Sequence, residues 1–169
     1  AAIACNPSHF QAFNNRGMAF RELRLFDEAI ADFGSSIALQ PDFADGYWNK
    51  ALTHLMVGDY ETAWQLYEHR WDSPNFPSKK RDFGKPLWLG AQSLNGKTIL
   101  LHSEQGLGDS LQFCRYIKNF EELPCTVLLE IERPLMRIME CLLPAAQIFE
   151  KGSDLPAFDF HCPLLSLPL

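Results

Sequence analysis

Apolar side chains in the first 72 residues fall into two successive units with the same pattern of helical stretches. Sliding the sequence against itself by 34 residues superposes like residues throughout both units. The superposed pairs are Phe13 with Tyr47, Asn15 with Asn49, Gly17 with Ala51, Phe26 with Tyr60, Asp27 with Glu61, Ala29 with Ala63, and Phe33 with Tyr67. Each unit therefore predicts two antiparallel helices joined by a short turn: 9–23 with 26–39, and 43–57 with 60–72.

Beyond residue 73 the pattern changes. Proline and glycine recur between residues 73 and 97, which is typical of a linker. Two β-type runs, 98–104 and 126–132, start 28 residues apart with a helical stretch at 110–120 between them, a spacing that predicts a parallel βαβ unit. A further helix at 134–143 and strands at 147–150 and 158–162 continue the alternation. The predicted fold class is α+α/β, with helical repeats over 1–72, a linker over 73–97 and a partial Rossmann-like α/β domain over 98–169.

Composition narrows the possible partners. The chain has 169 residues with 15 basic and 21 acidic side chains, so its net charge is −6, and it lacks the positive field that nucleic-acid binding requires. Five scattered cysteines without a CxxC pair indicate reduced thiols in a cytoplasmic protein, and no metal site is expected. No apolar run reaches the roughly 18 residues of a membrane span.

A glycine-rich turn, residues 105–109, carries the candidate chemistry of the second half. Its residues Gln105, Gly106 and Gly108 follow the first predicted strand, where open α/β sheets bind ligands and where backbone N–H groups favour an anion. The third glycine of a dinucleotide fingerprint is absent, and Leu111 stands in its place. Asp109 has two interpretations: a functional carboxylate, or the N-cap of the following helix.

The repeated units resemble the tetratricopeptide repeat. Its small and aromatic landmarks stand at Gly17, Phe20, Ala29, Phe33 and Pro41, whereas the second unit departs from them with His54 and Asn75. The resemblance implies a stacked array with a concave surface that takes a protein or peptide ligand. It also implies that the array begins inside a repeat, so the chain is expected to be a piece of a longer protein.

Asn15 and Asn49 occupy the same position in successive repeats. They resemble the asparagine ladder of the protein O-linked N-acetylglucosamine transferase, in which amide side chains hold a peptide backbone. The alternative interpretation is that Asn is common at this position and is only solvated.

The whole chain resembles a bacterial family in which tetratricopeptide repeats precede a glycosyltransferase-like domain of the two-Rossmann (GT-B) type, related to the heptosyltransferases. The segments that carry this resemblance are LLHSEQGLGDSLQFCRY and FDFHCPLLSLP. It implies a nucleotide-sugar donor for the parent protein and Asp109 as a catalytic base, while this chain, which lacks the donor domain, is expected to hold no cofactor and to be inactive. The alternative function is a non-catalytic scaffold that binds only protein partners.

The last predicted strand, 158–162, raises one structural question. A parallel sheet that stops there leaves a strand edge and part of one face uncovered. The sequence therefore predicts that either the C-terminal tail or a second copy of the chain, in a homodimer, covers this edge.

Overall fold

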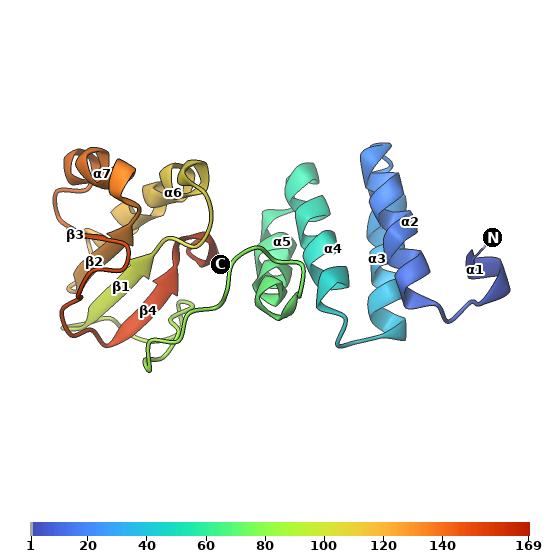
Figure 1. Ribbon diagram of the computed structural model, residues 1–169, viewed down its shortest axis with the longest axis horizontal. Helices are drawn as coiled ribbons and strands as arrows, with labels where there is room; N and C mark the ends of the chain where they lie inside the picture. Colours follow the sequence, from blue (N-terminus) through green and yellow to red (C-terminus); the bar gives the residue numbers. More distant parts are fainter. Residues whose placement is uncertain (1) are drawn as a thin grey trace. The chain divides into compact units, whose positions relative to one another are not determined.

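The computed structural model describes residues 2–169, which divide into two compact units. The first unit ends at Phe76 and the second begins at Pro77, so residues 73–76 of the expected linker pack with the repeats and residues 77–97 pack with the α/β domain. Helices of the first unit are α1 (Ala2–Cys5), α2 (Phe10–Glu22), α3 (Phe26–Leu39), α4 (Ala44–Val57), α5 (Tyr60–Tyr67) and the 3₁₀ helix η1 (Glu68–Asp72). Figure 1 shows α2 with α3 and α4 with α5 as antiparallel pairs.

The predicted helical hairpins are confirmed, with one difference. The stretch 60–72 is not one α-helix, because it tightens into a 3₁₀ helix after Tyr67. Small residues lie where the helices touch: Ala29, Ala51 and Ala63 have no exposed surface. A Cβ atom at Gly17 would stand 2.8 Å from the ring of Phe33, so a larger side chain there would force the two helices apart.

The turns inside the two hairpins share a left-handed residue. Gly58 ends α4 with a φ of 82°, and Arg24, 34 residues earlier, has a φ of 61°. Glycine adopts this conformation without strain, whereas arginine does so at a cost. In the second turn Asp59 also caps α5, because its carboxylate accepts a hydrogen bond from the backbone N–H of Thr62 at 3.3 Å.

The second unit is a parallel sheet of four strands. The strands are β1 (Thr98–His102), β2 (Thr126–Ile131), β3 (Gln147–Glu150) and β4 (Phe160–Pro163), in the spatial order β3-β2-β1-β4. Between them come α6 (Leu107–Phe113) with η2 (Cys114–Phe120), then η3 (Arg133–Leu135) with α7 (Met136–Leu142), and finally η4 (Leu164–Ser166). The predicted βαβ connection is confirmed, since β1 and β2 pair in parallel over five residues from Thr98↔Thr126 to His102↔Glu130.

The two faces of this sheet are covered differently. Helices α6 and α7 lie over one face (Figure 1), which carries apolar side chains such as Val127 and Leu129. The opposite face carries His102, Glu130 and His161, all buried. Residues 77–97, which we call the covering segment, place Arg81 and Phe83 on this face in place of helices and then run along the edge strand β4.

Two residues of the covering segment hold it against this face through their side chains. The Arg81 guanidinium pairs through both of its outer nitrogens with the Glu130 carboxylate, whose side chain is 1% exposed. The ring of Phe83 lies 5.0 Å from His102 and 4.9 Å from His161, measured between ring centroids. Arg81 is therefore committed to an internal ion pair.

The covering segment also corrects the expectation about the β4 edge. The backbone N–H of Trp88 donates to the carbonyl of His161 at 2.8 Å, and the N–H of His161 donates to the carbonyl of Pro86 at 3.1 Å. Pro163, at the end of the strand, has no N–H to offer. Residues earlier in the chain, not the C-terminal tail or a second copy, thus occupy this edge, and the reason for expecting a homodimer is removed.

Within residues 2–169 no helix combines the length and apolar character needed to cross a membrane.

Candidate functional site

A polar groove of about 390 Å³ lies between the first helices of the two hairpins. Nine residues from α2, α4 and the segments beside them line it: Gln11, Asn14, Asn15, Met18, Phe43, Asp45, Trp48, Asn49 and Asn75. Both asparagines of the predicted ladder, Asn15 and Asn49, are among them. The repeat places them on the same side of adjacent helices, and the fold brings them to one surface.

The two asparagines differ in whether their side-chain amides already form hydrogen bonds within the protein. The Asn49 amide nitrogen donates to the Asn14 side-chain oxygen at 3.1 Å, and its own oxygen accepts from Arg21 at 3.4 Å. Asn15 is exposed and makes no side-chain hydrogen bond to the described part of the chain. Asn49 is therefore fixed by its neighbours, whereas the donor and acceptor of the Asn15 amide are not used by the described part of the chain.

A carboxylate, that of Asp45, also lines the groove. Asp45 lies one helical turn before Asn49 on α4 and accepts hydrogen bonds from the Ser73 hydroxyl and from the Asn75 amide, the latter at 2.6 Å. Sequence reasoning missed Asp45, although the four-residue spacing from Asn49 could have indicated it. It could not have found Asn75, which follows η1 and reaches the groove only through the fold.

The glycine turn follows β1 at the carboxyl edge of the sheet. Gly106 is the N-cap of α6, Gly108 is exposed in its first turn, and Gln105 and Asp109 are half-buried. The Asp109 carboxylate lies against the turn, 3.7 Å from where a Cβ atom on Gly106 would stand. The interpretation of Asp109 as the N-cap is wrong, because the helix begins two residues earlier, at Leu107, and Asp109 lies within it.

A charged cluster beside this turn was not found from the sequence. Glu132, just past β2, accepts hydrogen bonds from the Ser103 hydroxyl at 2.8 Å and from Lys151 at 3.0 Å. Burial alone would raise the pKa of Glu132, but these two donors hold it below its usual value. The sequence does show that acidic residues interrupt or end both β-type runs, which is unusual for buried strands. It does not show which cation each of these carboxylates contacts.

The histidines of β1 and β4 lie next to each other on the sheet face opposite α6 and α7, and both are buried. His102 Nε2 lies 3.3 Å from His161 Nδ1. Burial, with the neighbouring His161 and Arg81, lowers the pKa of His102 to about 3, so this imidazole is neutral at pH 7. Among residues 2–169 no three His, Cys, Asp or Glu side chains gather in a metal-binding arrangement.

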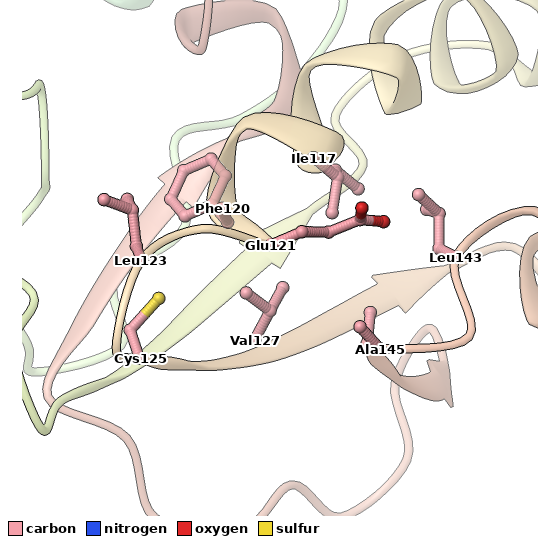
Figure 2. A pocket seen from close by; sticks show the side chains of 9 residues that line it. Ile117, Phe120, Glu121, Leu123, Cys125, Val127, Leu143 and Ala145 are labelled. Atoms are coloured by element: carbon pink, nitrogen blue, oxygen red, sulfur yellow. The ribbon is translucent and has the colours of Figure 1, made fainter.

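A smaller hollow of about 80 Å³ lies between the helical layer and the sheet (Figure 2). Figure 2 shows Val127 at its floor, Ile117 and Phe120 above, and Leu143 at one end. Glu121 is the one charged residue among its nine lining residues, and the rest are apolar or, at Cys125, a thiol whose pKa burial raises. This hollow brings together none of the predicted site residues.

Comparison with known proteins finds one relative that aligns with most of the chain and others that align with about 40% of it. No protein-family model matches the chain. Protein FlbA of Caulobacter vibrioides is 24% identical over 188 aligned residues, which cover 88% of this chain and 31% of FlbA. The chain thus spans about a third of the length of this relative.

Other similarities concern shorter stretches. The Hsp70-Hsp90 organizing protein of Triticum aestivum is 34% identical over 67 residues, 40% of this chain and 12% of that protein. A solved TPR2B domain of yeast Sti1, in a complex with pHsp70, is 31% identical over 40% of this chain and 54% of that domain's chain, with a TM-score of 0.39. A solved O-GlcNAc transferase of Thermobaculum terrenum covers 89% of this chain and 36% of its own at 11% identity and a TM-score of 0.41.

Three observations indicate the same kind of repeat in the first unit: the helical hairpins, the 34-residue period and the relatives that align with this part of the chain. Helices of equal order in the two hairpins present equivalent residues to one groove, and small residues fill equivalent contacts. The first unit of the chain consists of tetratricopeptide-like helical repeats, followed by a small parallel α/β sheet.

Proposed function

We propose that the first unit binds an extended peptide segment of a partner protein in the groove between α2 and α4. The observation that carries this proposal is the juxtaposition of five amide side chains in one groove: Gln11, Asn14, Asn15, Asn49 and Asn75. An extended peptide presents N–H and C=O groups that pair with nothing else, and an amide side chain both donates and accepts. A polar groove of this kind suits a backbone better than it suits an apolar small molecule.

The test is peptide binding by the whole chain. A library of nine-residue peptides identifies binders, and fluorescence anisotropy then compares the chain with its variants. We expect Asn15→Ala to weaken binding about fivefold, the value of one net hydrogen bond, and Asn119→Ala, at an exposed asparagine of the second unit, to leave it unchanged. If both variants bind equally well, the groove is not the binding site.

The α/β unit supports a second proposal, that it belongs to a glycosyltransferase-like cleft of the GT-B type in the whole protein. The strand order β3-β2-β1-β4 reverses direction beside β1, and the glycine turn directly follows β1. Ligands of open α/β sheets bind at such a reversal, at the carboxyl ends of the strands. In this proposal Asp109 acts as the general base that takes a proton from an acceptor hydroxyl, and the donor is a nucleotide sugar held elsewhere.

This second proposal is tested on the whole protein with a panel of nucleotide sugars. Replacing Asp109 by Asn removes the base while it preserves the shape of the side chain, so we expect nucleotide release to fall by a factor on the order of 10²–10⁴. Asp154→Asn, at an exposed aspartate in the same unit, is the matched control. Equal rates in both variants would remove Asp109 from the reaction, and no release with any donor would favour the scaffold function instead.

A further inference from the structure

The groove between α2 and α4 has an uneven charge. Of its nine lining residues, Asp45 is the only charged one, and the other eight are amides, aromatics and a methionine. The nearest cation to the Asn49 amide, Arg21, does not line the groove. The surface offered to a ligand is therefore negative on one side and neutral elsewhere, in a chain whose net charge is −6.

Asp45 is not neutralised by the protein. Its two oxygens accept from a hydroxyl, Ser73, and from an amide, Asn75, both of which are uncharged donors. No Lys, Arg or His among residues 2–169 forms an ion pair with it. Each carboxylate oxygen has a second lone-pair direction, so Asp45 can accept further hydrogen bonds from a ligand.

An aromatic ring completes this side of the groove. Trp48 follows Asp45 by three residues on α4 and therefore lies on the same helical face. Phe76 holds the indole in place by an edge-to-face contact at 5.4 Å between ring centroids. A fixed indole beside an uncompensated carboxylate attracts a cation in two ways, through charge and through the ring face.

We propose that the peptide bound in this groove carries a lysine or arginine whose cationic end is received by Asp45 and Trp48. This inference rests on the proposed peptide-binding function and adds the chemical class of the ligand. It disfavours an acidic segment, because such a ligand would bring like charge to Asp45 and would find no cation lining the groove. The basic side chain fixes the register of the peptide, while Asn15 contacts its backbone.

The test compares three peptides on the unmodified chain, so that no variant needs to fold. They share the sequence of one library binder and carry lysine, acetyl-lysine or glutamate at its basic position. We expect the lysine peptide to bind about three- to tenfold more tightly than the acetyl-lysine peptide, and the glutamate peptide to bind more weakly still. The preference shrinks as salt is raised from 0.05 to 0.5 M, because the charges are partly exposed.

A variant then locates the preference. Asp45→Asn keeps an acceptor for Ser73 and removes the charge, so the ratio of lysine to acetyl-lysine affinity falls to about one. Asp42→Asn, at an exposed carboxylate that does not line the groove, leaves the ratio unchanged. Urea unfolding of both variants shows whether either change disturbs the fold.

The outcomes separate this inference from the function on which it rests. Library binders that depend on Asn15 but show no preference for basic residues overturn this inference and leave peptide binding intact. A preference for basic residues that survives Asp45→Asn in a folded chain also overturns it. A library that yields no binder overturns both.

Discussion

The two units of this chain are stabilised by contacts of different range. In the repeats, each helix packs on the next helix along the chain, and small residues such as Gly17 and Ala29 set the spacing. In the α/β unit, β1 pairs with β4 across 61 residues of sequence, from Ile99 to Phe160. Neighbouring contacts form wherever the local pattern is right, whereas distant contacts require every intervening segment to be in place.

The units also differ in which part of the chain supplies the cation for a buried carboxylate. In the repeats, Arg16 of α2 pairs at 2.6 Å with Asp32 of α3, whose side chain is 7% exposed. In the α/β unit, Glu130 is 1% exposed and depends on Arg81 of the covering segment. A buried carboxylate without its partner is costly in either unit, but Arg16 is held on a helix, whereas Arg81 lies in irregular backbone. The comparison predicts that the α/β unit is the more vulnerable to single changes.

The largest effect is expected from removing the covering segment. A chain of residues 77–169 keeps the cover over His102 and Glu130 and the pairing at β4, and we expect it to fold. A chain of residues 98–169 loses both and is expected to be unfolded or aggregated. Amide dispersion in nuclear magnetic resonance spectra distinguishes the two, and equally folded products would show that the segment is only a linker.

The next largest effect is expected from breaking the ion pair between Arg81 and Glu130. Arg81→Ala leaves the Glu130 carboxylate without a cation, and we expect the α/β unit to lose about 3 kcal/mol of unfolding free energy. Hydrogen exchange followed by mass spectrometry reports each unit separately and should show the repeats unchanged.

Two controls sharpen this prediction. Lys79→Ala removes an exposed charge two residues away and should have little effect. Replacing Arg81 and Glu130 together by leucine removes both charges and should restore much of the lost stability. A loss in the double variant as large as that in Arg81→Ala would mean that the charge pair is not the cause.

In the repeats, overpacking is expected to cost less. Gly17→Leu places a side chain where the Phe33 ring already stands, and Ala29→Phe crowds the same helix contact, so each should destabilise the first unit by about 1–3 kcal/mol. Gly34→Ala is the matched control, because its new Cβ atom meets nothing closer than 3.8 Å and alanine favours the helix by up to about 1 kcal/mol. Thermal unfolding measures all three, and unchanged stability in the first two would contradict the repeat packing.

The smallest expected effect is a change in the stability of the α/β unit with pH. His102 takes up a proton at its ordinary pKa of 6.5 when unfolded but only near 3 when folded. Between these values the unfolded state binds more protons, so stability falls as the pH falls, by about 1.4 kcal/mol per pH unit. Burial also lowers the pKa of the adjacent His161, which acts in the same direction. Urea unfolding from pH 7 to pH 5 measures the slope, which should be smaller in His102→Asn; an equal slope would assign it to other groups.

Prediction from the sequence succeeded where a pattern is local. The helix pairs were predicted to within a few residues, apart from the 3₁₀ turn after Tyr67, and β3 was predicted with its observed bounds. Asn15 and Asn49 were singled out by their period, which also places them on one surface. Asp45 escaped notice because it has no counterpart in the first repeat, where Gln11 stands.

The sequence by itself determined which segments are helices or strands and where one architecture gives way to the other, because periodicity depends on residues close along the chain. Only the tertiary structure decided that the covering segment lies against one sheet face and the β4 edge, that Arg81 meets Glu130 and that Asn75 joins Asp45 in the groove. These partners are 28 to 49 residues apart or lie in irregular backbone. No repeating pattern marks such contacts, since they depend on how the finished elements pack in three dimensions.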